Sequence, residues 1–203
     1  MKICGVTRVA DALAAARAGA HAVGLVFYRP SPRYVEPDAA AAIVRALPPF
    51  VTPVGLFVDA DEEEVRAISA RSRVQMLQFH GTESAAFCAR FDLPYMKAVR
   101  VRPGVDLLQY AHDFHSATAL LLDAYQEGLH GGTGAVFDWN LIPQALPLPI
   151  VLSGGLTPEN VGEAIRRVRP TAVDVSSGVE AAKGIKDARK IGAFITGVRN
   201  ADV

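Results

Sequence analysis

Short apolar runs alternate with amphipathic segments along almost the whole chain. The runs are continuously apolar, as in strands whose two faces are both covered, and they lack the alternation of a strand with one wet face. The segments between them repeat apolar residues at i, i+3, i+4 and i+7, which places those residues on one face of a helix. We therefore expect strands at residues 2–4, 22–27, 51–58, 74–79, 95–101, 117–122, 150–152 and 172–175.

The helical spacing is clear in four segments and weaker in four others. It is clear at residues 9–16, 40–47, 161–168 and 191–198, and weaker at residues 61–71, 83–91, 105–112 and 139–146. Asp61 with Glu64 fits a capped helix start, and Thr157 with Pro158 fits another. This alternation predicts an α/β protein, a (β/α)8 TIM barrel. Because no Pro/Gly/Ser-rich linker interrupts the series, we expect a single domain over residues 1–203.

Charge and hydropathy exclude two classes of partner. Lys plus Arg and Asp plus Glu each number 21, so the formal net charge is zero and no overall field attracts nucleic acid or an anionic membrane. The sequence shows no charged-then-apolar leader and no apolar stretch long enough to span a bilayer. We expect a cytoplasmic protein with a small-molecule substrate, in which Cys4 and Cys88 are free thiols.

Two glycine turns close apolar runs in the last quarter of the chain. Gly154 and Gly155 follow the run at residues 150–152, and Ser177 and Gly178 follow the run at residues 172–175. Glycine lets backbone N–H groups approach an anion closely, and a nearby helix start adds a favourable dipole. In (β/α)8 barrels the loops after the seventh and eighth strands frequently bind phosphate. The two turns therefore predict a phosphate site.

Cys4 and Asp123 stand where the first and sixth apolar runs stop. In a (β/α)8 barrel these strand ends face the active site. A thiolate is a competent base when a nearby cation or dipole stabilises it, and a buried carboxylic acid is a competent proton donor. Taken alone, Cys4 can be a small buried hydrophobe and Asp123 a turn cap. Because both share a rim with the phosphate site, we predict that they form an acid–base pair.

Eight segments, in order and at barrel spacing, resemble the phosphoribosylanthranilate isomerase family over essentially the whole chain. They are residues 2–7, 24–28 with 31–34, 54–58, 78–81, 121–123, 131–134 with 137–139, 152–156 with 158–161, and 173–180. The resemblance implies an intramolecular oxidoreductase of tryptophan biosynthesis, at the third step from chorismate, that uses neither metal nor cofactor. Its reaction would be the Amadori rearrangement of N-(5-phosphoribosyl)anthranilate to 1-(2-carboxyphenylamino)-1-deoxyribulose 5-phosphate.

The resemblance also implies roles for three side chains. Asp123 aligns with the general acid, which protonates the furanose ring oxygen so that the ring opens to a Schiff base. Cys4 aligns with the general base, which removes the proton from the sugar C2 to give an enolamine. Arg33 aligns with the residue that holds the anthranilate carboxylate, a pairing that guanidinium suits because it can form two parallel bonds.

The other positions that match the family concern the phosphate and the pocket wall. Backbone N–H groups would hold the phosphate at Gly154, Gly155, Ser177 and Gly178. Asp174 matches the family pattern, either as a binding residue or by orienting its neighbours. His80 either lines the pocket or has a structural role. A lysine at position 183, where the family commonly has proline, is expected to loosen a turn without changing the chemistry.

Other functions on the same fold fit the residues less well. A metal-dependent sugar-phosphate epimerase needs more than one histidine at strand ends, and only His80 is so placed. Indole-glycerol-phosphate synthesis relies on lysine acids at strand ends, whereas Lys97 lies inside an expected strand. A barrel that merely binds a phosphorylated metabolite requires neither Cys4 nor Asp123.

Three alternatives stay open at the level of sequence. The protein can be a monomer or a homodimer. It can act on a second substrate, such as the aminoaldose phosphate of histidine synthesis, although one clear phosphate site and Arg33 favour the single activity. The glycine-rich residues 125–137 can close over the substrate or form an ordinary connection.

Overall fold

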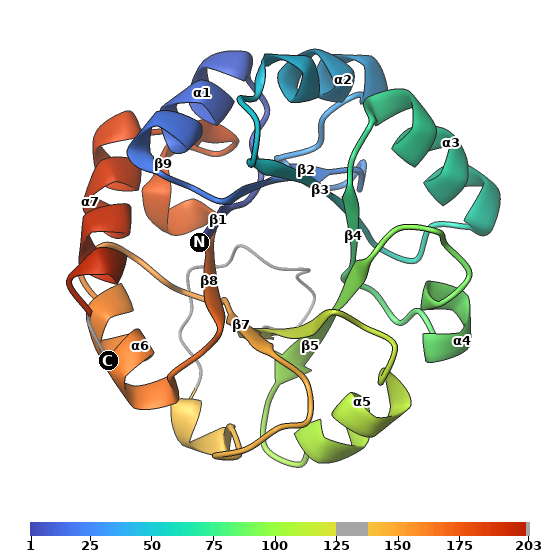
Figure 1. The fold of residues 1–203 in the computed structure, drawn as a ribbon, viewed down its shortest axis with the longest axis vertical. Coiled ribbons are helices and arrows are strands. Elements are labelled where there is room, and N and C mark those ends of the chain that lie inside the picture. Colours follow the sequence, from blue (N-terminus) through green and yellow to red (C-terminus); the bar gives the residue numbers. More distant parts are fainter. Residues whose placement is uncertain (125–137, 202–203) are drawn as a thin grey trace.

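The computed structural model describes residues 1–124 and 138–201, so the proposed closure of residues 125–137 lies outside the described part. Eight parallel strands form a closed barrel in chain order, and β1 pairs with both β2 and β8 to complete the ring (Figure 1). The strands are β1 (Lys2–Ile3), β2 (Ala22–Val26), β3 (Thr52–Phe57), β4 (Met76–Phe79), β5 (Tyr95–Val101), β6 (Ala119–Ala124), β7 (Ile150–Leu152) and β8 (Ala172–Val175). The (β/α)8 fold expected from the sequence is confirmed.

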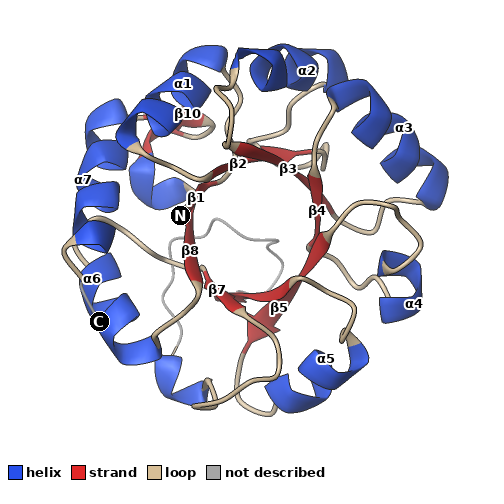
Figure 2. Ribbon diagram, in the orientation of Figure 1, coloured by secondary structure: helices blue, strands red, loops and turns tan. Residues whose placement is uncertain are grey.

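Helices surround the barrel and cover the outer face of its strands (Figure 2). They are α1 (Val9–Ala18), α2 (Pro37–Ala46), α3 (Glu62–Ser72), α4 (Ala85–Cys88), α5 (Leu107–Asp113), α6 (Val161–Val168) and α7 (Ala188–Arg199), with 3-10 turns η1 (Trp139–Leu141) and η2 (Ser177–Val179). Asp61 caps α3 as expected, because its carboxylate accepts a hydrogen bond from the Glu64 amide at 2.8 Å.

Residues 139–146 were expected to form a helix and make only the single turn η1. Pro143 and Pro147 follow this turn, and proline removes a backbone donor and disfavours helix in the residue before it. Trp139 is 8% exposed, and the Arg167 guanidinium carbon lies 5.9 Å from the centre of its ring. The predicted helix at residues 83–91 is likewise reduced to the four residues of α4.

The start of α6 was also predicted wrongly. The helix begins at Val161 with Asn160 as its N-cap, three residues after the expected start at Pro158. The Asn160 side-chain oxygen accepts from the Thr157 amide at 2.8 Å, and the Thr157 hydroxyl accepts from the Glu159 amide at 3.2 Å. These local side-chain bonds close a turn in front of the helix, so Thr157 shapes the approach to α6 and does not cap it.

A hairpin that the sequence analysis did not predict follows β8. It consists of β9 (Glu180–Ala182) and β10 (Ile185–Lys186), paired antiparallel. Its turn contains Gly184 with φ +77°, and the Gly184 carbonyl accepts from the Thr7 hydroxyl at 2.6 Å. The Lys186 amide donates to the Asp11 carboxylate of α1 at 3.0 Å. The hairpin is therefore tied to the segment that follows β1, beside α1 and α7 (Figure 1).

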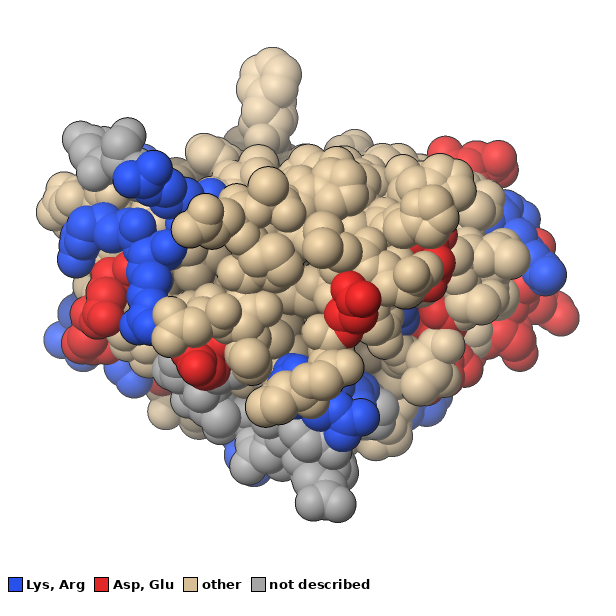
Figure 3. All heavy atoms as spheres, turned by 90° about the horizontal axis from the view of Figure 1, so that it is seen from below, with Lys and Arg blue, Asp and Glu red and all other residues tan. Residues whose placement is uncertain are grey.

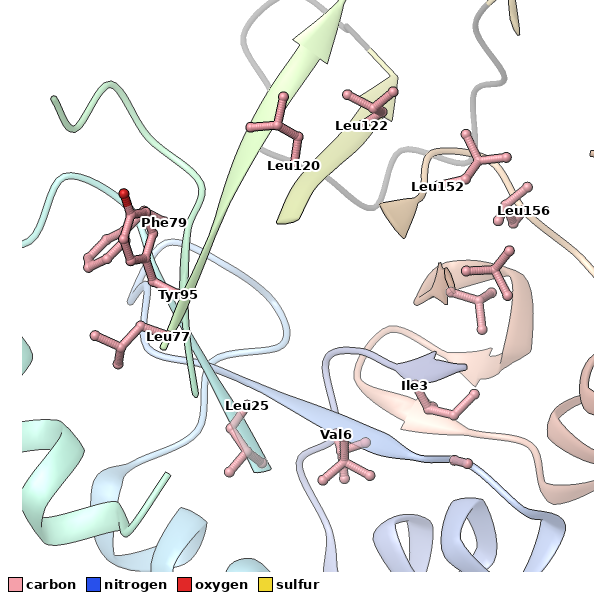
Figure 4. Close-up of a cluster of buried hydrophobic side chains, with 14 of the residues drawn as sticks. Ile3, Val6, Leu25, Leu77, Phe79, Tyr95, Leu120, Leu122, Leu152 and Leu156 are labelled. Atoms are coloured by element: carbon pink, nitrogen blue, oxygen red, sulfur yellow. The ribbon is translucent and has the colours of Figure 1, made fainter. Parts of the chain in front are cut away.

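The hydrophobic core has two parts, separated by the wall of the barrel. Outward-facing side chains pack between strands and helices, and several of these are drawn in Figure 4: Leu25, Leu77, Phe79, Leu120, Leu122 and Leu152. A second cluster fills the barrel interior with Val54, Met96, Ala98, Ala119, Leu121 and Val151. Above it, toward the C-terminal strand ends, lies a small layer of Cys4, Val26, Leu56 and Val58. The interior is packed, and the site begins where this apolar layer ends.

Charged side chains of both signs lie near one another at the edges of the face shown in Figure 3, and the middle of that face carries few charges. Such neighbouring opposite charges cancel at short range, in keeping with a formal net charge of zero. Within residues 1–124 and 138–201, every helix is too short or too polar to cross a lipid bilayer.

Candidate active site

The two-residue period of the strands directs polar side chains into the C-terminal end of the barrel. Leu121 belongs to the interior cluster, and Asp123, two residues further along β6, points the same way. The same alternation places Cys4 two residues beyond Lys2 and His80 two residues beyond Gln78. All of these side chains are buried, at 6% exposure or less.

Four of these residues, Cys4, Gln78, His80 and Asp123, line one cavity of about 50 Å³. Its wall is formed by Cys4, Val26, Tyr28, Ser31, Arg33, Leu56, Val58, Gln78, His80, Asp123, Ser153, Asp174 and Ser176. The structure therefore brings together five of the positions singled out in the sequence, which are Cys4, Arg33, His80, Asp123 and Asp174. Their roles in binding and catalysis stay predictions.

A chain of hydrogen bonds leads to Asp123. The Gln78 side-chain nitrogen lies 3.0 Å from His80 Nδ1, and His80 Nε2 lies 3.1 Å from Asp123 Oδ2. With the Gln78 amide oriented in this way, it donates to Nδ1, and the hydrogen of a neutral imidazole is on Nε2, where it is donated to Asp123. The Ala124 amide donates to the other oxygen, Oδ1, at 3.0 Å. His80 thus both lines the cavity and orients the Asp123 carboxyl group.

Cys4 lies beside a buried ion pair. Lys2 Nζ donates to Asp174 Oδ1 at 2.9 Å, and the two side chains are 5% and 4% exposed. Strand register explains this pair, because Lys2 and Asp174 are partners across β1 and β8. Gly24 leaves room for these groups, since a Cβ there would lie 2.6 Å from Cys4 Sγ and 3.1 Å from Lys2 Cε.

This environment shifts the acidity of both Cys4 and Lys2. Burial raises the pKa of the Cys4 thiol, and the Lys2 ammonium only partly opposes this effect. Burial by itself would lower the pKa of Lys2, but the Asp174 carboxylate and the neighbouring Cys4 together outweigh it, and the pKa of Lys2 is raised. Lys2 is therefore a stable cation next to a thiol that ionises reluctantly.

Arg33 reaches the cavity from the loop between β2 and α2, and a carboxylate holds it there. Its Nε donates to Glu180 Oε1 at 2.7 Å and its Nη2 donates to Glu180 Oε2 at 2.8 Å. Both residues are 9% exposed. The guanidinium predicted to hold a substrate carboxylate already forms a bidentate pair with Glu180.

The two glycine turns lie against each other at the ends of β7 and β8. Gly154 and Gly155 have φ of +80° and +65°, values that residues with a Cβ adopt at a cost. A Cβ on Gly178 would lie 2.0 Å from the Leu156 carbonyl oxygen, so only glycine fits the contact between the turns. Ser177 and Gly178 begin the turn η2. The sequence-based phosphate residues are thus neighbours in space, next to the cavity wall formed by Ser153 and Ser176.

Residues 1–197 match the family model of N-(5'phosphoribosyl)anthranilate (PRA) isomerase. The chain belongs to this family. The phosphoribosylanthranilate isomerase of Dechloromonas aromatica (strain RCB) is 59% identical over 202 residues, which cover 100% of this chain and 97% of the relative.

Two solved phosphoribosylanthranilate isomerases share the fold. One, in complex with reduced 1-(o-carboxyphenylamino)-1-deoxyribulose 5-phosphate, has a TM-score of 0.84 at 38% identity and covers 98% of this chain and 97% of its own. The other is a monomeric form of the dimeric enzyme from Thermotoga maritima, with a TM-score of 0.86, 38% identity and the same two coverages, 98% and 97%. The function expected from the sequence is confirmed: the chain is a phosphoribosylanthranilate isomerase of tryptophan biosynthesis.

The sequence analysis missed the charged residues that support this isomerase site. Lys2 could have been predicted from the sequence, because strand alternation places its side chain on the same side as Cys4. The sequence gives less reason to expect Glu180 and Lys186 at the site, since they lie on a hairpin that was not predicted. Among the residues that the structure describes, no three His, Cys, Asp or Glu side chains are grouped so that they could hold a metal ion.

Proposed function

We propose that Cys4 and Asp123 catalyse the isomerisation as general base and general acid. The observation that supports this most directly is their position on one cavity, with Cys4 following β1 and Asp123 on β6, separated in the ring by β7 and β8. A small substrate between them would meet a proton acceptor on one side and a donor on the other, which an aldose–ketose rearrangement requires.

In the first step Asp123 gives a proton to the furanose ring oxygen. The C1–O bond breaks, its electron pair stays with that oxygen, and C1 forms a Schiff base with the anthranilate nitrogen. His80 Nε2, 3.1 Å from Asp123 Oδ2, holds the carboxyl group in place.

In the second step the Cys4 thiolate removes the proton from C2. The C–H electron pair forms the C1–C2 double bond, the Schiff base takes up the electrons, and the resulting enolamine tautomerises to the aminoketose. The positive charge of Lys2 stabilises the thiolate form of Cys4. Because burial still raises the pKa of the thiol, the ionised fraction near neutral pH is small, and the rate should increase as the pH rises.

The two ends of the substrate would occupy different parts of the rim. Arg33 would bind the anthranilate carboxylate with the guanidinium edge that Glu180 does not use. The phosphate would accept hydrogen bonds from backbone N–H groups of the two glycine turns, at Gly154, Gly155, Ser177 and Gly178. Asp174 would orient Lys2, with which it forms an ion pair, and Ser153, whose hydroxyl is 3.4 Å from Asp174 Oδ2.

We further propose that the protein works in the cytoplasm as a homodimer, the second of the two oligomeric states left open by the sequence. Cys4 and Cys88 are free and buried, which suits a reducing compartment. A related structure is described as coming from a dimeric enzyme. Phe50 is fully exposed and lies on the loop before β3, where a second copy could cover it.

The test is turnover of enzymatically generated phosphoribosylanthranilate, followed by the loss of its fluorescence. We expect Cys4→Ala and Asp123→Asn to lower kcat by at least ~100-fold, the usual contribution of a positioned acid or base. Both variants should still bind the reduced product analogue. The matched control is Cys88→Ala, which removes the other buried thiol and should keep wild-type turnover. Near-normal kcat in Cys4→Ala or Asp123→Asn would refute the corresponding assignment.

A further inference from the structure

A buried network of charged groups connects Arg33 to the loop that follows β8. Its centre is Glu180 on the hairpin, whose Oε1 accepts from Arg33 Nε at 2.7 Å and from Lys186 Nζ at 2.9 Å. Its Oε2 accepts from Arg33 Nη2 at 2.8 Å, and the Gly184 amide approaches Oε1 at 3.3 Å. Lys186 is 4% exposed and donates also to the Ser176 carbonyl at 3.0 Å.

The geometry of guanidinium determines what this network leaves for a ligand. Arg33 has five N–H donors in a rigid fork. Glu180 accepts from Nε and from one N–H of Nη2, which together form one edge of the group. Among the described residues, the Nη1 group and the second N–H of Nη2 have no bonding partner, and one N–H of each forms the end edge, which suits a second carboxylate. Glu180 therefore fixes the plane in which Arg33 can offer its free edge.

The charges in the network also suit a monoanion. Arg33 and Lys186 are cations and Glu180 is an anion, so the buried group carries one net positive charge. Burial tends to raise the pKa of Glu180, but the hydrogen bond from Arg33 and the nearby Lys186 outweigh it and lower that pKa, so Glu180 is ionised at neutral pH. Without the Glu180 charge, two buried cations would face each other with no compensation.

We propose that Glu180 is a positioning residue for substrate binding, which orients Arg33 toward the carboxylate at the aryl end of the substrate. Lys186 donates to the same Glu180 oxygen as Arg33 Nε and joins it to Ser176, the residue before the phosphate turn at Ser177 and Gly178. The hairpin thereby sets the relative position of the two anion sites. This inference rests on the carboxylate-binding role proposed above for Arg33.

Glu180→Gln tests the proposal, because it keeps the shape of the side chain and removes its charge. Inhibition by two half-ligands separates the two ends of the site: anthranilate carries the carboxylate, and ribose 5-phosphate carries the phosphate. We expect the KM for substrate and the Ki for anthranilate to rise about tenfold or more. A rise of this size corresponds to loss of the charge-assisted pair between Arg33 and the ligand carboxylate. The Ki for ribose 5-phosphate should stay within about twofold, and kcat should change much less than KM.

A double variant decides whether Glu180 acts through Arg33. If it does, Arg33→Ala/Glu180→Gln should bind anthranilate as weakly as Arg33→Ala alone. The matched control is Lys183→Ala, an exposed change in the same hairpin turn that should leave both inhibition constants unchanged. Should Glu180→Gln fold poorly, Glu180→Asp carries the test, since it restores the charge at a shorter reach and should give an intermediate KM.

Three results would overturn the proposal. An unchanged Ki for anthranilate in Glu180→Gln would mean that Arg33 needs no orienting partner. An equal rise in both inhibition constants would indicate a general structural role for the hairpin. If the losses of anthranilate binding in the two single variants simply add in the double variant, Glu180 and Arg33 act independently. A failure of the carboxylate-binding role itself is distinguishable, because Arg33→Ala would then leave the anthranilate Ki unchanged.

Discussion

Replacement of Lys2 by methionine should strongly destabilise the barrel. The substitution keeps most of the apolar stem and removes the ammonium that lies 2.9 Å from Asp174 Oδ1. The remaining side-chain partner of Asp174 among the described residues is the Ser153 hydroxyl, at 3.4 Å. A carboxylate that is 4% exposed would then be buried without a counter-ion, which costs about 3–5 kcal/mol. In a chain of this size each kcal/mol lowers Tm by about 2–4 °C, so we expect a decrease of roughly 6–20 °C.

The measurement is equilibrium urea unfolding of Lys2→Met, Asp174→Asn and the double variant at neutral pH. Because the double variant leaves no uncompensated charge, it should lose less stability than the sum of the two single losses, by more than about 1 kcal/mol. The exposed pair of Arg71 and Asp38 provides a control, since Asp38→Asn should leave the unfolding midpoint almost unchanged. A loss below about 1 kcal/mol in Lys2→Met, or additive losses in the double variant, would refute the reasoning.

Four further outcomes follow from the same contacts. Arg33→Ala should raise the KM about tenfold or more by loss of a charge-assisted pair, and an unchanged KM in initial-rate assays would place the substrate carboxylate elsewhere. Gly178→Ala should lower the free energy of unfolding in urea by about 1–3 kcal/mol, because its Cβ would lie 2.0 Å from the Leu156 oxygen. The same change should weaken inhibition by ribose 5-phosphate, and unaltered inhibition would contradict the phosphate assignment. The ratio kcat/KM should rise from neutral to alkaline pH as the Cys4 thiol, whose pKa is raised by burial, loses its proton, and a flat profile would exclude it as the base. Burial raises the pKa of Cys88 to about 12, so the unfolded chain, with an ordinary thiol near about 8.5, loses its proton first as the pH rises. Stability should therefore fall above about pH 8.5, by up to about 1.4 kcal/mol per pH unit, and Cys88→Ala should reduce this slope in urea unfolding; an identical slope would show that Cys88 is not its source.

The barrel itself was predictable because the same sequence pattern, a continuous apolar run, recurs for each strand. Each strand is covered on both faces, so each appears as a continuous apolar run, and closure of the ring needs only eight such runs in order. What failed were elements governed by local contacts. Thr157 has the right residue type for a cap, but Asn160 accepts from the Thr157 amide and closes a turn before the helix begins. Residues 139–146 have helical spacing, but their prolines end the helix after one turn.

The site was predictable where residue type and strand end coincide. Cys4 and Asp123 are ionisable residues at the ends of apolar runs, and the structure places both on one cavity. The supporting charges were not predictable in the same way, because a pair such as Arg33 and Glu180 is separated by 147 positions in the chain. Such a contact depends on a short, polar hairpin, and neither periodicity nor composition reports on it.

The chain's single tryptophan, Trp139, is a built-in optical probe. It is 8% exposed, beside Arg167, and no other indole contributes to the emission of the protein. Indole emission overlaps the absorption of an aminobenzoate ring, so excitation of Trp139 would transfer energy to a bound anthranilate derivative. Substrate binding would then be visible without a label and without turnover. In Asp123→Asn this signal would give the affinity for the substrate itself, free of any contribution from the chemical step.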